Sequence, residues 1–318
     1  MIYIKLGEKS MCYTCKIYPR KYNYVNEITQ QGLTLSCIEA AKLVLMNKET
    51  MEFDLIETNQ KQTLFSKIIK SNTGNNFLEN NFEEIREFSI DIVQNRKFSI
   101  EERLIILGLF CKDLNNILEN NISISNLINK YNDYISKGYY ENILEKINIE
   151  KTIDAQLSLL VLLSKNIVFN KVIVHEKYFY NLSEMIKGLK LNDNIDDCKA
   201  NFVKVYDKEY KNFICDKEYI YENYLVNYMF NELFPYNVED NISKSYITLI
   251  VNFVMIKLNA IGLCAYYKEN MSEYKLVELI QSYSKSMLHE DDLNIRIQEY
   301  LKSTNQDTIN HMILMIGK

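Results

Sequence analysis

Glycine and proline are unusually scarce in this chain, and their scarcity limits the folds open to it. The 318 residues include 8 glycines and 2 prolines. Both residues punctuate turns and tight loops, so a fold built from many short strands would need more of them. The sequence shows no fixed-period repeat and no run of alternating strands and helices. We therefore predict an all-α fold, an irregular multi-helix bundle.

Apolar residues at spacings of three and four indicate where the helices lie. Two capping boxes mark helix starts, because a Ser and a Glu three residues later can satisfy each other's backbone donors. The first pairs Ser36 with Glu39 and the second pairs Ser99 with Glu102. Further helices are predicted at roughly 125–136, 139–148, 153–168, 174–189, 194–213, 217–234, 244–268, 272–288, 291–302 and 306–316.

The N-terminal region differs from the rest of the chain. Residues 1 to about 35 hold little helical periodicity and look irregular. The stretch 71–76 is the only strongly polar, glycine-containing break in the first half. We therefore predict a small, mostly irregular cysteine-bearing lobe over residues 1–75 and a helical domain over residues 76–318.

Composition restricts the partners and the compartment. The net charge of −5 and the pI near 5.5 provide no basic field for nucleic acid. Seven cysteines, an odd number, suit a reducing cytoplasm better than a disulfide scaffold. The apolar stretch from Tyr246 to Tyr267 contains Asn252, Lys257 and Asn259, which are costly inside a bilayer, so we predict a buried core helix rather than a transmembrane segment. The sequence indicates no oligomeric state.

Three cysteines near the N-terminus form the clearest candidate for chemistry. Cys12 and Cys15 are spaced so that both thiolates can reach one metal ion or cluster. Cys37 follows Ser36 at a predicted helix start, where backbone N–H groups favour thiolate. These three residues suggest a metal or iron–sulfur anchor.

Other interpretations of the three cysteines remain open from spacing alone. They fit ordinary thiols, or a thiol redox pair, although the strand-to-helix context of a thioredoxin-like motif is absent. A structural zinc site would need a fourth ligand, and the only histidines, His175, His289 and His311, lie far downstream.

Arginine is scarce in this chain, so each arginine is a candidate for a fixed ion pair or for a planar, two-pronged contact with an anion. The arginines are Arg20, Arg86, Arg96, Arg103 and Arg296.

Several catalytic signatures are missing. The sequence has no glycine-rich turn of the GxGxxG type, no phosphate loop, no CxxxCxxC, no HExxH and no GxSxG. A Rossmann-type methyltransferase or dehydrogenase is therefore not indicated. Composition and spacing lead only to a cytosolic helical protein with a candidate metal site.

Several short segments, taken in their order along the chain, resemble a known protein family, which the spacing of the cysteines alone does not indicate. The first two segments run from Leu6 through Cys12 and Cys15 to Arg20, and from Leu33 to Leu43. The others are 85–89, 94–104, 107–110, 222–228, 233–235, 279–283 and the region of His289. Together, in this order, the sequence resembles the flagellin lysine-N-methylases over nearly the whole chain.

The resemblance implies a function and a set of ligands. Members of that family are similar in transferring methyl groups from S-adenosylmethionine to flagellin lysines, with a [4Fe–4S] cluster held by cysteines. By position, Cys12, Cys15 and Cys37 would be cluster ligands, with zinc as the alternative metal. Arg20 would hold a carboxylate or seal the cluster pocket, or make a surface salt bridge. Glu222 and the tyrosines around it, Tyr221, Tyr224 and Tyr228, would line a lysine channel or belong to the core.

The chain also departs from the family pattern. Family members usually begin with a further cysteine-rich segment upstream of the point where this sequence starts, so we expect a member that lacks it. A four-iron cluster commonly takes four thiolates. With three, the site is incomplete, uses an outside ligand, or leaves one iron open to S-adenosylmethionine. The competing hypothesis is a metal-stabilised helical module that binds flagellin or an assembly factor without catalysis, including an inactive truncated enzyme.

Overall fold

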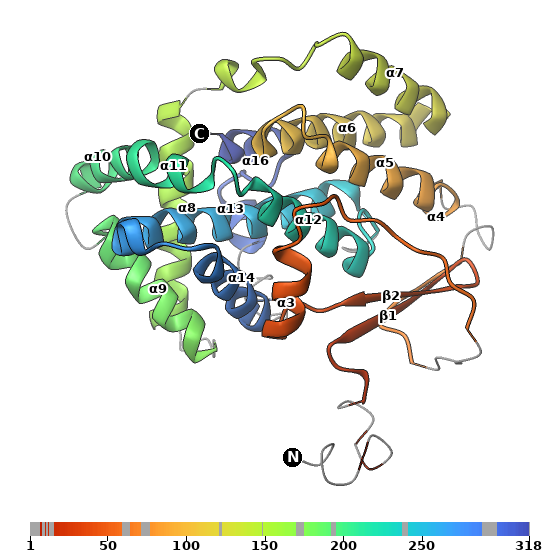
Figure 1. Cartoon of the computed structure of the whole chain (residues 1–318). Coiled ribbons are helices and arrows are strands. Elements are labelled where there is room, and N and C mark those ends of the chain that lie inside the picture. The colour runs from red at the N-terminus through yellow and green to blue at the C-terminus, as the bar shows by residue number, and fades with distance from the viewer. Residues whose placement is uncertain are drawn as a thin grey trace.

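The computed structural model shows a predominantly helical molecule, with a small sheet near the N-terminus (Figure 1). It describes Gly7, Ser10, Cys12 and residues 16–58, 64–70, 77–120, 123–147, 149–169, 175–191, 195–236, 241–287 and 298–317. The predicted all-α fold with a small N-terminal lobe is confirmed. The longer helices after the lobe are α5 Phe82–Gln94, α6 Ile100–Asn120, α7 Ile124–Ser136, α8 Ile149–Phe169, α9 Glu176–Leu189, α10 Ile195–Val205, α12 Glu218–Glu232, α13 Ile242–Tyr267, α14 Glu273–Met287 and α16 Ile309–Ile316.

The N-terminal lobe contains a hairpin that we did not predict. Strands β1 (Arg20–Val25) and β2 (Ile28–Leu33) pair antiparallel, and β3 (Ile68–Ile69) adds to β1 in parallel. Asn26 and Glu27 form the turn with φ of 48° and 68°. Two consecutive positive φ values suit a tight hairpin turn, which is usually signalled by Asn-Gly. Because Glu occupies the second position here, the signal was weak, and the expectation of an irregular segment up to about residue 35 was wrong.

Helix α13 lies at the centre of the core. It is buried along nearly its whole length and contacts α6, α9, α14 and α16. Its polar side chains have partners inside the fold: the Tyr283 hydroxyl donates to Asn252 Oδ1 at 2.7 Å, and the Lys257 ammonium lies 2.8 Å from Glu101. Residues 242–270 are long and apolar enough to cross a membrane, and 94% of the most apolar window is buried in the fold.

The two predicted capping boxes have different outcomes. At Ser99 the box is confirmed, because its backbone N–H donates to Glu102 Oε2 at 2.9 Å and the Glu102 N–H donates to Ser99 Oγ at 3.4 Å. At Ser36 it is wrong: Cys37 is the N-cap of α3 (Ile38–Leu45), with no side-chain cap bond. The Ser36 hydroxyl instead lies within hydrogen-bonding distance of Thr34 and Tyr18, which draws it away from the helix start.

Two other predicted helices also differ from the structure. The helix predicted at 139–148 is only a short 3₁₀ turn, η2 (Ile143–Lys146), since Gly138 and Asn142 adopt positive φ just before it. The helix predicted at 194–213 continues from α10 through a π turn, η3 (Tyr206–Tyr210), into α11 (Lys211–Ile214). The break at 71–76 and most of the helix at 291–302 lie outside the described residues, so the division at residue 75 stays a prediction.

Candidate functional site

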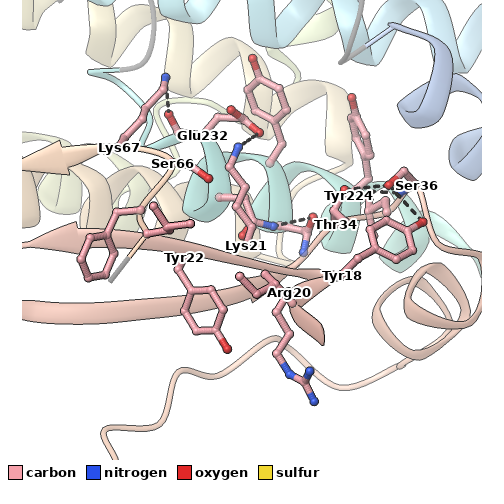
Figure 2. Close-up of a pocket in the computed structure, with 17 residues that line it drawn as sticks. Tyr18, Arg20, Lys21, Tyr22, Thr34, Ser36, Ser66, Lys67, Tyr224 and Glu232 are labelled. Atoms are coloured by element: carbon pink, nitrogen blue, oxygen red, sulfur yellow. Dashed lines mark hydrogen bonds and ion pairs between the residues drawn. The ribbon is translucent and has the colours of Figure 1, made fainter. Parts of the chain in front are cut away.

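A cavity of about 610 Å³ lies between the N-terminal lobe and α12 (Figure 2). Its size is within the usual range of small-molecule sites. Four segments meet there: the residues around the start of β1, the residues that follow β2, the stretch before β3 and the C-terminal half of α12. The lining residues are Ile17, Tyr18, Arg20, Lys21, Tyr22, Thr34, Leu35, Ser36, Leu64, Phe65, Ser66, Lys67, Tyr224, Asn227, Tyr228, Asn231 and Glu232.

Aromatic rings form much of the cavity wall. They come from both sides, Tyr18, Tyr22 and Phe65 from the lobe and Tyr224 and Tyr228 from α12. Burial raises the pKa of the Tyr224 phenol well above its usual value, so this ring is uncharged at neutral pH. Faces of neutral aromatic rings attract sulfonium and methylated ammonium groups, because the ring quadrupole places negative potential over the face.

The cavity has one carboxylate among its lining residues, that of Glu232 at the end of α12. The Lys21 ammonium lies 2.5 Å from Glu232 Oε1, and both side chains are partly exposed. The Lys67 ammonium donates to the Glu232 backbone carbonyl at 3.5 Å. Glu232 therefore joins the lobe to α12, and its side chain stays partly exposed.

Asparagines hold the hairpin against α12. Asn227 and Asn231 each donate a side-chain N–H to the Leu33 carbonyl, at 3.1 and 3.0 Å, and Asn23 donates to the Asn231 carbonyl at 2.9 Å. Gly32 fits against this row, since a Cβ there would lie 2.0 Å from Asn231 Oδ1. Asn223, Asn227 and Asn231 recur every four residues and so share one face of the helix. That spacing was the available signal for this interface, and we missed it because Asn is abundant throughout the chain.

The three predicted cluster ligands are only partly described. Cys12 is exposed, Cys37 is half-buried at the start of α3, and Cys15 lies outside the described residues. Within the described ranges, no three His, Cys, Asp or Glu side chains gather as a metal site. Two of the three thiols in the donor set are thus placed on the lobe, and their assignment as ligands stays a prediction. Cys264, in contrast, is buried in the core, and burial raises the pKa of its thiol to about 12.

Arg20 lines the cavity, but its guanidinium turns away from it in Figure 2. Its described hydrogen bond goes to the Lys16 carbonyl at 3.4 Å, and no described carboxylate pairs with it. Neighbouring residues along a strand point to opposite faces, so Arg20 and Lys21 diverge. Its predicted role in binding a carboxylate or sealing a cluster pocket stays a prediction.

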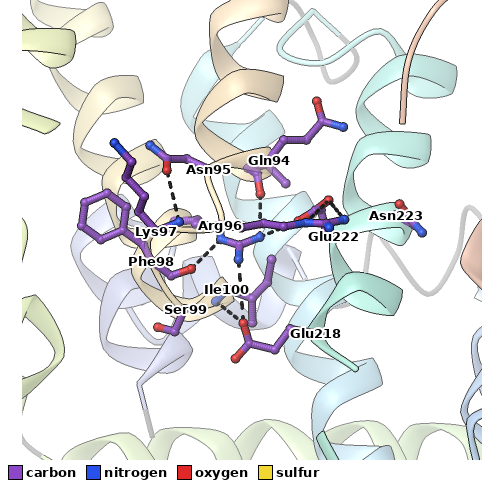
Figure 3. Close-up of polar contacts among 12 residues, drawn as sticks. Gln94, Asn95, Arg96, Lys97, Phe98, Ser99, Ile100, Glu218, Glu222 and Asn223 are labelled. Atoms are coloured by element: carbon purple, nitrogen blue, oxygen red, sulfur yellow. Dashed lines mark hydrogen bonds and ion pairs between the residues drawn. The ribbon is translucent and has the colours of Figure 1, made fainter. Parts of the chain in front are cut away.

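Glu222 does not line the cavity, although it shares α12 with residues that do. Its carboxylate is fully buried and receives N–H groups from Arg96 at 2.8 to 3.2 Å (Figure 3). Arg103 donates a further N–H to it at 2.7 Å. Arg96 also donates to the Lys48 carbonyl, and Arg103 to the Phe98 and Val93 carbonyls. The expected fixed ion pairs of Arg96 and Arg103 are confirmed. Glu222 is consequently a structural anchor in the core, away from the lining of the cavity.

The fold and the cavity define a class: a predominantly helical protein with an aromatic-walled cavity between a small N-terminal lobe and α12. The family model that describes the FliB lysine N-methylase C-terminal domain matches residues 86–315, from α5 to α16. The chain belongs to this family, and the resemblance to flagellin lysine-N-methylases is confirmed. No curated protein and no solved structure matches the chain. Helix α12 lies inside the matched range, and the three cysteines lie before it.

Proposed function

We propose that this chain is a cytoplasmic protein-lysine N-methyltransferase that moves methyl groups from S-adenosylmethionine to lysine side chains of flagellin. The observation that carries the proposal is the aromatic-walled cavity against α12, a helix inside the matched family range. We also propose a [4Fe–4S] cluster held by Cys12, Cys15 and Cys37 of the N-terminal lobe. Zinc is the alternative metal.

The lining chemistry suits both reactants. The methyl donor is a sulfonium cation, and a methylated lysine is an ammonium cation, so rings such as Tyr224 and Tyr228 attract each of them. An attacking lysine must first lose its proton. The ammonium groups of Lys21 and Lys67 lower the pKa of an amine that enters beside them, and Glu232 is the nearby carboxylate that can accept the proton.

Transfer of a labelled methyl group tests the proposal directly. The chain is purified without oxygen, and transfer from labelled S-adenosylmethionine to purified flagellin is followed. We expect label on flagellin lysines, and we expect Tyr228→Ala to reduce the rate at least tenfold. The matched control is Tyr139→Ala, a change at an exposed tyrosine outside the cavity, which should leave the rate unaltered. If the unaltered chain transfers no methyl group to flagellin, the proposed methyltransferase activity is refuted.

Metal content tests the cluster separately. We expect iron and sulfide to co-purify with the chain, and Cys12→Ser, Cys15→Ser and Cys37→Ser each to reduce the iron content. Cys215→Ser is the control, because Cys215 is exposed and lies far along the chain on the helical domain. Stoichiometric zinc without transfer would instead support the metal-stabilised binding module. A titratable dithiol at Cys12 and Cys15 with no metal would support thiol redox exchange.

A further inference from the structure

Residues 52–57 form an exposed strip beside the hairpin and α12. The strip consists of Glu52, Phe53, Asp54, Leu55, Ile56 and Glu57, all exposed, with Leu55 at 84% and Ile56 at 76%. It is neither helix nor strand, and no backbone N–H or carbonyl within it bonds another described backbone group. Exposed apolar side chains beside unbonded backbone are features of a segment that pairs with a second polypeptide.

A groove of about 260 Å³ adjoins the strip. Phe53 anchors the strip there, because its ring stacks on Phe230 of α12 at 4.6 Å between centroids. Asn227 lines both this groove and the aromatic-walled cavity, so the two hollows meet at the same turn of α12. The groove is lined by Gln31, Gly32, Leu33, Leu43, Val44, Asn47, Met51, Glu52, Phe53, Asn223, Asn227 and Phe230.

The strip carries charge of one sign. Glu52, Asp54 and Glu57 are exposed, and none of them pairs with a described cation. No Lys or Arg occurs between positions 49 and 58. Three carboxylates that pair with no cation in the described part of the chain, set among apolar side chains, attract a partner that is basic and apolar, and they repel an acidic one.

We propose that the strip and its groove dock an extended, lysine-containing segment of the methyl-accepting flagellin. The segment pairs its backbone with residues 52–57, places an apolar side chain in the groove and sets its basic side chains against the three carboxylates. This inference rests on the proposed function for the identity of the partner, since a segment held here lies next to the cavity that shares Asn227.

Binding of purified monomeric flagellin to the full chain, without S-adenosylmethionine, tests the docking surface. The triple variant E52K/D54K/E57K should raise Kd about tenfold or more, because it turns three attractions into repulsions. L55S/I56S should also raise Kd, without a change of charge. The matched control is E145K/D197K/E269K, which alters net charge equally at exposed positions elsewhere. Its Kd should stay within twofold of that of the unaltered chain.

Two results overturn the docking surface. One is a Kd for flagellin that the strip variants leave unaltered, or that the control variant raises as much as the strip variants do. The other is a self-associated chain that the strip variants convert to monomers, which would make a second copy the occupant. Failure here is distinct from failure of the proposed function. If the chain transfers labelled methyl groups but the strip variants bind flagellin as well as the unaltered chain does, only the docking surface is refuted. If binding depends on the strip but no methyl group is transferred, only the proposed enzymatic activity is refuted.

Discussion

Two of the three glutamates on helix α12, Glu222 and Glu232, have opposite surroundings. Glu222 is fully buried, and two arginines saturate its carboxylate. Glu232 lies ten residues further on, is 25% exposed in its side chain, and pairs with Lys21 at the wall of the cavity. The family match covers both. The difference shows how surroundings decide what a glutamate can do. A carboxylate whose oxygens all accept hydrogen bonds from the protein holds the fold together, whereas a partly exposed carboxylate beside a cavity can also bind a ligand.

The structural consequence of each glutamate follows from its neighbours. Glu222 joins Arg96 in the turn between α5 and α6 to Arg103 within α6, and Arg96 reaches the segment after α3 through the Lys48 carbonyl. Three parts of the chain therefore depend on one carboxylate. Glu232 joins only the hairpin and the stretch before β3 to the end of α12.

The largest effect is predicted for Glu222→Ala. Arg103 is only 4% exposed, and without Glu222 its charge is left buried with one distant carboxylate, that of Glu218 at 3.9 Å. Removal of one partner from a buried ion pair costs about 3–5 kcal/mol. We expect the free energy of unfolding, measured by urea denaturation, to fall by that amount. Glu232→Ala is the control on the same helix and should cost about 1 kcal/mol or less. Equal losses for the two would refute the distinction between them.

Much of the fold could be predicted from sequence, because the signals of a helix, apolar periodicity and capping residues, lie within the helix segment itself. Apolar periodicity located α7, α9 and α13 within a few residues, and the pair Ser99 and Glu102 marked the start of α6. The hairpin was missed because its turn lacks glycine and its strands alternate weakly. Scarcity of arginine marked all five arginines as candidates for a fixed ion pair, and two of them, Arg96 and Arg103, form one with Glu222.

The cavity could not be predicted in the same way. Its walls come from residues 17–22, 34–36, 64–67 and 224–232, and only the tertiary fold brings them together. The sequence indicated Tyr224 and Tyr228, but it equally indicated Tyr221 and Glu222, which lie in the core. Helical spacing gives the face on which a residue lies, and does not tell whether that face meets a cavity or another helix.

A smaller effect is predicted for Gly32→Ala, which tests how the hairpin docks on the Glu232 half of α12. The new Cβ would lie 2.0 Å from Asn231 Oδ1, so β2 or the asparagine must move. Overpacking of this kind costs about 1–3 kcal/mol. We expect that loss in urea denaturation, together with weaker binding of S-adenosylmethionine, because the shifted hairpin carries one wall of the cavity.

A double variant provides the control for Gly32→Ala. Asn231→Ala removes the obstructing amide, although it also removes the hydrogen bond to the Leu33 carbonyl. The double variant should therefore lose less stability than the two single variants added together, as expected for residues in contact. Strict additivity would show that Gly32 is required for another reason.

The smallest stability effect, and the sharpest test of the comparison, is predicted for Glu232→Gln. Both members of its pair with Lys21 are partly exposed, so the substitution should cost less than about 1 kcal/mol. Loss of the cavity's carboxylate should nevertheless raise the KM for flagellin or lower kcat about tenfold, since the amine loses its proton acceptor. Glu39→Gln, which breaks a surface pair with Lys42 outside the cavity, is the matched control and should alter neither constant. A transfer rate that Glu232→Gln leaves intact, at unchanged stability, would mean that Glu232 is a structural residue like Glu222 and takes no part in the chemistry.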